Sequence, residues 1–295
     1  MTRPDPGPAE QWAADEGFEV DFADCSVGPI HYVAAGPETA PLVLLLHGFP
    51  DFWYTWRDHI APLAAEYRVV APDLRGYNRS ARPRGVSSYR LDRLRTDVYE
   101  LIQQLGYGTA SVVGHDWGGS LALSFARHHP AHVDRLVVAN TLDPERLAAQ
   151  LRGRQLLRSW YSGFFQLPWL PERVLGARDY RALCDLFRDL SGHDETDIER
   201  YLGAWRRKGR LTASVNYYRA LGRQTLKYPL GSPARVVVPT KLLWGTDDVA
   251  LRPSVLDRLA RGIDDPTVER YEGASHWVHA DEPDRFREDV RAFLP

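Results

Sequence analysis

The sequence predicts an α/β fold with a mostly parallel central sheet, helices on both faces and an inserted helical lobe. Between residues 42 and 140, apolar strand patterns alternate with helical ones, which is typical of a parallel sheet covered on both faces. After Asn140 this alternation stops, and several aromatic-rich helical segments with proline breaks follow. Strand patterns return near residue 235. We therefore expect the sheet to be interrupted by an insertion and completed by the C-terminal part.

The individual elements follow from local patterns. Strands are expected in FEVDFADC and GPIHYVAAG, as a hairpin at a sheet edge, and then in PLVLLLHG, YRVVAPDL, ASVVGH and VDRLVVAN. Helices are expected over residues 54–66, in SYRLDRLRTDVYELIQQL and in GSLALSFARHH. The last strands are expected in RVVVPTKLLWG and TVERYEGA, followed by the helix PDRFREDVRAFL. The Pro-rich first eight residues are expected to be a disordered tail.

These elements divide the chain into three parts. Residues 1–141 are expected to form the first part of the core, residues 142–231 a helical cap, and residues 232–295 the second part of the core.

Composition excludes several classes of partner. The formal net charge is −2, so no strong field favours nucleic acid or an anionic membrane. The two cysteines, Cys25 and Cys184, lack a metal-type spacing, and the N-terminus lacks the apolar stretch of a signal peptide. No apolar run approaches the roughly 20 residues that span a bilayer. We expect a cytoplasmic protein, monomeric or homodimeric, with no membrane or nucleic-acid partner.

Asp116 is the most informative residue of the chain. It stands at the turn between the strand ASVVGH and the next helix, in Gly114-His115-Asp116-Trp117-Gly118. In α/β-hydrolases a G-x-S-x-G turn in this context lifts a serine nucleophile above the sheet, and its glycines permit the sharp bend. A carboxylate attacks esters and amides poorly, but it can displace a leaving group at a saturated carbon and form an ester. Asp116 therefore predicts an epoxide or a carbon–halogen substrate and argues against an esterase.

Asp248 and His276 complete a candidate catalytic set. Hydrolysis of an Asp116 ester needs a base that activates water and a carboxylate that orients this base. Asp248 follows the strand KLLWG, and His276 follows the strand TVERYEG. The order nucleophile, acid, histidine is that of α/β-hydrolases, and the carboxyl ends of parallel strands meet in one crevice. Taken alone, Asp247 or Asp248 could simply cap the following turn, and His276 could be an ordinary loop histidine. The occurrence of both residues after consecutive strands favours catalysis.

The segment LLLHGFPDFWYTW supplies a candidate oxyanion hole. The backbone N–H groups of Phe49 and Trp117 would donate to the oxyanion that forms when water attacks the Asp116 ester. His47 is expected to brace this loop. The alternative is that HGFP is only a tight turn. Trp53 and Trp117 are expected to line an apolar substrate pocket, with plain core packing as the alternative.

The chain resembles the epoxide hydrolases of the α/β-hydrolase superfamily from about Phe18 onward. The resemblance rests on HGFPDFWYTWR, DLRGY, GHDWGG, LLWGTDD and GASHW, which stand in the family order. It implies that two cap tyrosines, Tyr161 and Tyr218, hold and protonate the epoxide oxygen. Tyr218 is preferred over its neighbour Tyr217 because it matches the family pattern NxYR. The alternative role for cap aromatics is packing of the cap against the core, which is expected of Trp160, Phe164, Phe165, Trp169 and Tyr217.

The chain departs from the family pattern at two positions. Asn78 stands where the family shows glycine, and asparagine tolerates the left-handed conformation, so the loop is expected to be retained. His279 stands where the family often has a polar residue, and it is expected at the surface.

The sequence therefore predicts an epoxide hydrolase that acts on a small apolar epoxide without a metal or organic cofactor. A haloalkane dehalogenase would use the same Asp116, Asp248 and His276. However, such an enzyme does not need a cap tyrosine pair. One halide-binding pattern of that family has asparagine in place of Phe49, and a fluoroacetate dehalogenase resembles GHDRGG, with arginine where Trp117 stands. A non-catalytic ligand-binding protein on this fold is the alternative from a different class, and the complete Asp-Asp-His set argues against it.

Overall fold

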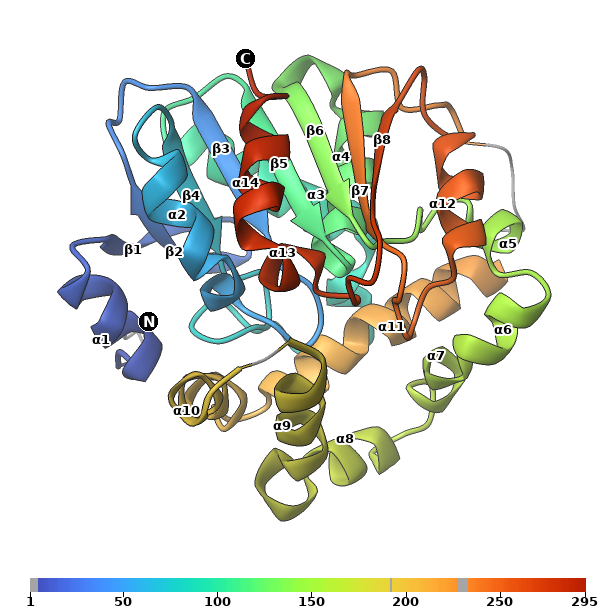
Figure 1. Cartoon of the computed structure of the whole chain (residues 1–295). Helices are drawn as coiled ribbons and strands as arrows, with labels where there is room; N and C mark the ends of the chain where they lie inside the picture. Colours follow the sequence, from blue (N-terminus) through green and yellow to red (C-terminus); the bar gives the residue numbers. More distant parts are fainter. Residues whose placement is uncertain (1–4, 192, 228–232) are drawn as a thin grey trace.

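A computed structural model describes residues 5–191, 193–227 and 233–295 of the chain. Its centre is an eight-stranded sheet with the strand order β1-β2-β4-β3-β5-β6-β7-β8 (Figure 1). The strands are β1 (Glu19–Cys25), β2 (Gly28–Ala35), β3 (Leu42–Leu46), β4 (Arg68–Pro72), β5 (Ala110–His115), β6 (Val133–Ala139), β7 (Thr240–Gly245) and β8 (Thr267–Tyr271).

The pairing confirms the predicted, mostly parallel sheet. Strand β1 pairs with β2, and β2 with β4, in antiparallel fashion, whereas the neighbouring strands from β4 to β8 are parallel. All residues of β3, β5 and β7 are buried, because helices cover both faces of a parallel sheet. Their side chains alternate between two hydrophobic clusters, with Leu44 on one face and Leu45 on the other.

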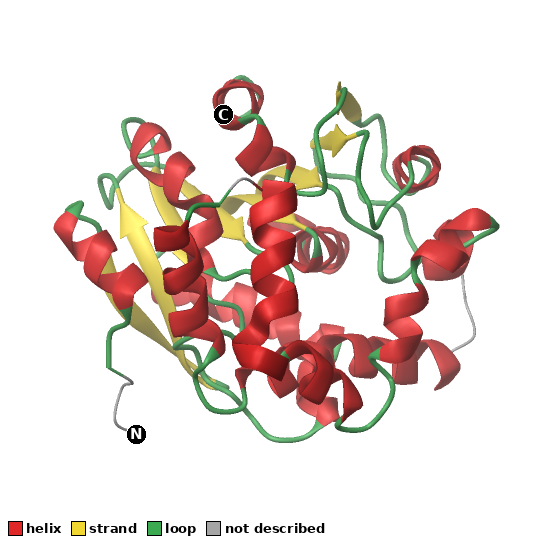
Figure 2. Ribbon diagram, turned by 60° about the horizontal axis from the view of Figure 1, so that its bottom comes forward, coloured by secondary structure: helices red, strands yellow, loops and turns green. Residues whose placement is uncertain are grey.

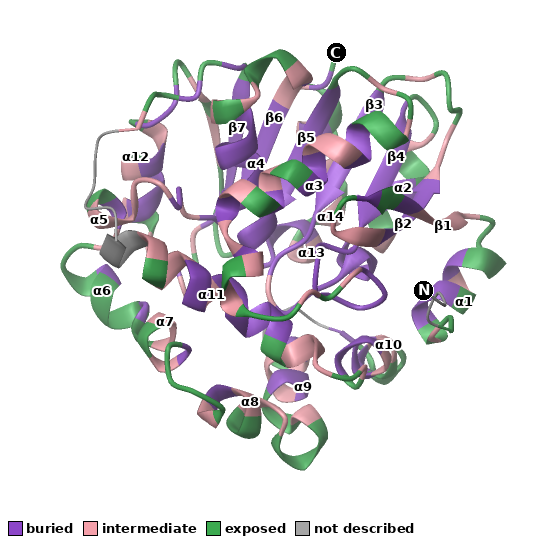
Figure 3. Ribbon diagram, turned by 180° about the vertical axis from the view of Figure 1, so that it is seen from behind, coloured by how far each residue is buried: buried purple, intermediate pink, exposed green. Residues whose placement is uncertain are grey.

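The helices that flank the sheet divide between its two faces. Apolar residues of α3, α4 and α12 pack into one cluster, and those of α1, α2 and α14 pack into the other. Figures 1 and 3 show these two layers from opposite sides. The helices are α1 (Pro8–Asp15), α2 (Arg57–Leu63), α3 (Leu91–Gln104), α4 (Trp117–His128), α12 (Pro253–Ala260), α13 (Val278–Asp281) and α14 (Pro283–Arg291), with short 3₁₀ turns η1 (Trp53–Trp56), η2 (Val86–Tyr89) and η3 (Pro130–His132).

A run of helices separates β6 from β7 and lies along one end of the sheet (Figure 1). These helices are α5 (Leu147–Gln150), α6 (Arg154–Arg158), α7 (Trp160–Phe164), α8 (Leu170–Leu175), α9 (Ala177–Ser191), α10 (Glu195–Trp205) and α11 (Arg210–Lys227). Figure 2 turns this end of the molecule toward the viewer and shows helices in front of the strands. The division into core and cap at residues 141 and 231 stays a prediction.

Three expectations were wrong in detail. The start of the chain is not wholly irregular, because α1 begins at Pro8; residues 1–4 of the expected tail lie outside the described residues. The helix expected over residues 54–66 is a 3₁₀ turn followed by the short α2. Trp160 and Trp169 do not pack the cap against the core, since they are 68% and 62% exposed.

Candidate active site

Asp116 occupies a strained turn at the end of β5. Its backbone has φ 49° and ψ −118°, a conformation that costs a non-glycine residue about 1–3 kcal/mol. The turn brings the start of α4 so close to β3 that a Cβ on Gly118 would lie 2.0 Å from the carbonyl oxygen of Leu46. Glycine is therefore required there, and the bend directs the Asp116 side chain into a cavity at the end of the sheet.

The loop after β3 holds the Asp116 carboxylate. The backbone N–H of Phe49 donates to Asp116 Oδ1 over 2.8 Å. The hydroxyl of Thr141, just beyond β6, donates to the Asp116 backbone carbonyl over 2.6 Å. The N–H of Trp117 belongs to the first turn of α4, where a helix has no internal acceptors for its amides. The Phe49 amide of the expected oxyanion hole therefore contacts the carboxylate, and the role of the Trp117 amide stays a prediction.

Gly48 offers a sensitive test of this arrangement. A Cβ at this position would lie 2.4 Å from Asp116 Cβ, so Gly48→Ala is expected to displace the carboxylate from Phe49. Because a misplacement of about 1 Å can cost roughly 100-fold in rate, we expect activity to fall by about that factor while the protein remains folded. Steady-state kinetics together with a thermal melt check this. Full activity in a folded variant would contradict it.

His276 and Asp248 lie next to Asp116. His276 Nε2 is 3.6 Å from Asp116 Oδ2, and His276 Nδ1 is 2.7 Å from Asp248 Oδ2. Asp248 also accepts the N–H groups of Ala250 and Leu251. Three residues that are distant in sequence are thus brought together at the carboxyl ends of β5, β7 and β8, because these ends meet at one edge of the sheet.

The charges of this group reinforce one another. Burial alone would lower the pKa of His276, but the carboxylates of Asp248 and Asp116 raise it to about 10. Burial alone would raise the pKa of Asp248 and of Asp116, but the facing His276 holds both below their usual value. The two carboxylates therefore favour the imidazolium form of His276 in the resting protein.

Asn140 fixes the orientation of Asp248, and the sequence reading missed its role. Its side-chain Nδ2 donates to Asp248 Oδ2 over 2.7 Å, and its Oδ1 accepts the N–H of Gly245 over 2.8 Å. The available signal was a polar residue directly after the apolar strand β6. The ends of neighbouring parallel strands lie side by side, so such a residue can reach the groups that follow β5 and β7. Thr141 carries the same signal.

A largely apolar cavity of about 400 Å³ opens over Asp116. Tyr161 from α7 and Tyr218 from α11 line it, and their ring centroids are 6.1 Å apart. Burial and the charge of Asp116 raise the pKa of both phenols above the usual value, so both remain protonated donors at neutral pH. The other lining residues are mostly aliphatic: Leu142, Pro144, Leu147, Ala148, Leu151, Leu221 and Leu251.

The structure separates Tyr218 from its neighbour Tyr217. Tyr218 faces the cavity, whereas the Tyr217 hydroxyl donates to the Arg75 carbonyl over 2.8 Å, within the core. Trp117 also lines the cavity, and its ring packs edge-on against Tyr218 at 5.0 Å.

Two expectations near the site were wrong. Trp53 does not line the cavity; it is fully buried, and its indole N–H donates to Glu10 Oε1 over 3.2 Å. The turn η1 directs this side chain toward α1, a helix that the sequence did not predict. His279 is not a surface residue; it is fully buried, and its Nε2 lies 2.7 Å from the Thr55 hydroxyl.

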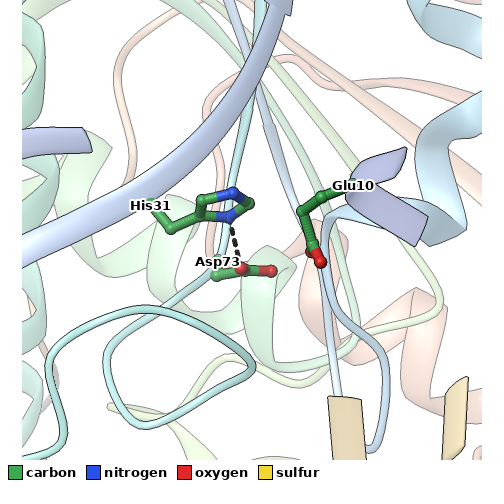
Figure 4. A group of neighbouring side chains, drawn as sticks. All are labelled: Glu10, His31 and Asp73. Atoms are coloured by element: carbon green, nitrogen blue, oxygen red, sulfur yellow. Dashed lines mark hydrogen bonds and ion pairs between the residues drawn. The ribbon is translucent and has the colours of Figure 1, made fainter. Parts of the chain in front are cut away.

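Glu10, His31 and Asp73 form the one cluster within the described ranges whose acidic and imidazole atoms are close enough for a metal ion, all within 4.8 Å (Figure 4). Both carboxylates and His31 Nδ1 already have hydrogen-bond partners, although His31 Nε2 has none in the described structure. His31 Nδ1 lies 2.6 Å from Asp73 Oδ2, and Asn78 Nδ2 donates to both carboxylates over 2.7 and 2.9 Å. Asn78 has φ 33°, as its replacement of glycine required. The cluster fits a role in joining α1 to the sheet better than metal binding.

The sheet order, the strained turn with an acidic residue and the carboxylate–imidazole pair define an α/β hydrolase. Residues 41–283 match the alpha/beta hydrolase fold family. The chain belongs to this family.

Comparison with individual relatives places the chain more narrowly within the α/β-hydrolase family. The chain is 38% identical to the AB hydrolase superfamily protein YfhM of Bacillus subtilis over 91% of this chain and 95% of that protein. It is 36% identical to Epoxide hydrolase 3 of Mus musculus over 90% of this chain and 73% of that protein. A crystal structure of Bacillus megaterium epoxide hydrolase in complex with an inhibitor superposes with a TM-score of 0.84 at 27% identity, covering 92% and 99% of the two chains. Within the family, the chain therefore groups with epoxide hydrolases.

Proposed function

We propose that this protein hydrolyses an epoxide to a vicinal diol through a covalent ester on Asp116. The observation that carries the proposal is the placement of Asp116, Tyr161 and Tyr218 around one apolar cavity, with His276 Nε2 3.6 Å from the carboxylate. Two phenols opposite a carboxylate suit a reaction that attacks carbon on one side and releases an alkoxide on the other.

In the first step, the Asp116 carboxylate attacks one epoxide carbon. The bond between this carbon and the epoxide oxygen breaks, and the oxygen takes a proton from Tyr161 or Tyr218. Such general-acid assistance contributes roughly 100- to 10,000-fold. The products are an alkyl ester on Asp116 and a phenolate.

In the second step, His276 removes a proton from water, and the oxygen of this water attacks the ester carbonyl carbon. The N–H groups of Phe49 and Trp117 donate to the resulting oxyanion; each such donor is worth about 100- to 1000-fold. The bond from the carbonyl carbon to the ester oxygen, which came from Asp116 and is now bonded to the substrate carbon, then breaks. The departing oxygen takes the proton from His276, the new Asp116 carboxyl returns a proton to the phenolate, and the diol leaves with one oxygen from Asp116.

The proposed sequence requires His276 to change its protonation state between the two steps. Asp116 is one of the charges that raise the pKa of His276 to about 10, and esterification removes that charge. The pKa should then fall, so that the imidazolium releases its proton to solvent and the neutral imidazole can accept a proton from water.

We therefore expect the pKa of His276 to be lower in Asp116→Asn than in the unmodified protein. An NMR titration of the imidazole measures both values. In turnover, hydrolysis of the ester should slow as pH falls below the His276 pKa of the ester form, because protonated imidazole cannot act as a base. Equal pKa values in the two proteins would contradict this account.

We also propose that residues 142–231 act as the cap that supplies both tyrosines, between core parts 1–141 and 232–295. The mostly aliphatic cavity wall supports a small apolar epoxide as substrate, because such a wall offers few polar partners.

Turnover assays separate the proposed function from its alternatives. The purified protein is expected to convert aryl and alkyl epoxides to diols and to release no halide from haloalkanes. Halide release without diol formation would show that the protein is a dehalogenase instead. Tight binding of an epoxide without either product would indicate a ligand-binding protein.

A further inference from the structure

The outer edge of the inserted helices exposes an unusual number of apolar side chains. Helices α6, α7 and α8 follow one another along the margin of the molecule away from the sheet (Figure 1), and their outer surface is largely exposed (Figure 3). Six of the eight exposed large apolar residues in the described chain lie here, and we call them the cap-edge patch: Leu156 (60%), Leu157 (76%), Trp160 (68%), Leu167 (44%), Trp169 (62%) and Val174 (48%).

The same edge carries uncompensated positive charge. Arg152, Arg154, Arg158 and Arg173 are all exposed, and none of them forms an ion pair with any residue that the structure describes. The one acidic residue between positions 147 and 175 is Glu172. Its carboxylate is already paired with Arg219 at 2.6 Å. The cap-edge patch is therefore an apolar surface interleaved with guanidinium groups that have no carboxylate partner among the described residues. Arg152 and Arg158 each donate only to a backbone carbonyl, and Arg173 lies over the Trp169 ring.

We propose that the cap-edge patch docks on an anionic lipid surface. Tryptophan and leucine side chains insert at the boundary between headgroups and acyl chains, and nearby arginines attract acidic headgroups. Two tryptophans, four other apolar residues and four arginines on one edge match this combination.

A second copy of the chain fits this surface less well. In a symmetric dimer the same patch would face itself, which would bring the four unpaired arginines of each copy together. Like charges brought together at an interface disfavour association. The formal net charge of −2 for the whole chain hides this local excess, which is why composition predicted no membrane partner.

The position of the patch would also bring the substrate cavity close to the lipid surface. The helices α5 to α7 that border the exposed edge contribute Leu147, Ala148, Tyr161 and Ser162 to the cavity wall. An apolar epoxide partitions into lipid, so docking at this edge would bring the cavity to the phase that holds the substrate. This part of the inference rests on the proposed function, whereas docking itself does not.

Vesicle co-sedimentation tests the docking. The full-length protein is expected to bind vesicles of phosphatidylcholine with 30% phosphatidylglycerol, to bind phosphatidylcholine alone more weakly, and to be released as salt is raised, because screening weakens the charge attraction. The triple variant Leu157→Gln, Trp160→Gln, Trp169→Gln should bind at least about tenfold more weakly. Arg154→Glu with Arg173→Glu should abolish the preference for phosphatidylglycerol.

Matched controls isolate the patch. Val237 is 61% exposed outside the patch, so Val237→Gln should leave vesicle binding unchanged. Arg84→Glu with Arg261→Glu makes the same change in net charge on exposed arginines elsewhere, and it should bind as the unmodified protein does. No vesicle binding, or equal losses in the controls, would overturn the proposal. So would a dimer that the triple variant converts to monomer in sedimentation velocity without any vesicle binding. Since binding is measured without substrate, turnover of a water-soluble epoxide reports separately on the proposed function.

Discussion

Replacing His276 with glutamine is expected to stop turnover after the first step and to leave the substrate bonded to Asp116. The base that activates water is gone, while Asp116 keeps the N–H of Phe49 at 2.8 Å and the cavity keeps both tyrosines. We expect multiple-turnover activity to fall at least about 1000-fold, within the range known for lost triad members. Intact-protein mass spectrometry should show one added epoxide per chain.

The double variant Asp116→Ala, His276→Gln is the control for this adduct. It should show no added mass, because the attacking carboxylate is missing. An adduct in the double variant, or diol formation at the normal rate by His276→Gln alone, would contradict the assignment of roles.

Removing both cap phenols is expected to abolish epoxide opening. In Tyr161→Phe with Tyr218→Phe, the cavity keeps its shape but offers no proton to the alkoxide. Each single variant should lose less than the pair, because the remaining phenol can still donate. For the pair we expect a loss of about 100- to 10,000-fold in the rate of ester formation, measured in single turnover by rapid quench.

Tyr217→Phe provides the matched control for the tyrosine pair. This neighbour loses only a hydroxyl that donates to the Arg75 carbonyl, so stability should fall by about 1 kcal/mol with little change in the rate of ester formation. A double phenylalanine variant that opens epoxides normally would remove the tyrosines from the mechanism. A Tyr217→Phe variant as slow as the pair would do so too.

Much of the fold was predictable because its signals are local. Strands such as Leu42–Leu46 are continuous apolar runs, and the helices between them have clear periodicity. Asp116, Asp248 and His276 could be proposed together because each lies within five residues of the end of a strand, and the ends of parallel strands converge. The structure brings these three side chains together, and their catalytic roles remain predictions.

The predictions for Trp53 and for the N-terminal segment were wrong because these positions depend on contacts with residues that are distant in the sequence. Trp53 lies in a short turn without helical periodicity, and its indole N–H donates a hydrogen bond to Glu10 of α1. Helix α1 itself has a Pro- and Gly-rich start, and it is held by contacts between Glu10, Trp53 and Asn78. Tertiary contacts of this kind leave no periodic signal in the sequence.

The exposed tryptophans of the cap were misjudged for a different reason. Aromatic residues are usually buried, so the sequence favoured packing for Trp160 and Trp169. Neither the burial nor the exposure of a side chain at a helix end follows from composition, because it depends on which face the neighbouring helices leave open.

Single turnover in oxygen-18 water, with enzyme in excess over epoxide, tests the central claim most directly. If the carboxylate of Asp116 attacks carbon, the first diol should contain no heavy oxygen, and Asp116 itself should carry the label afterwards. Heavy oxygen in the first diol would show that water attacks the epoxide directly, and it would contradict a covalent ester.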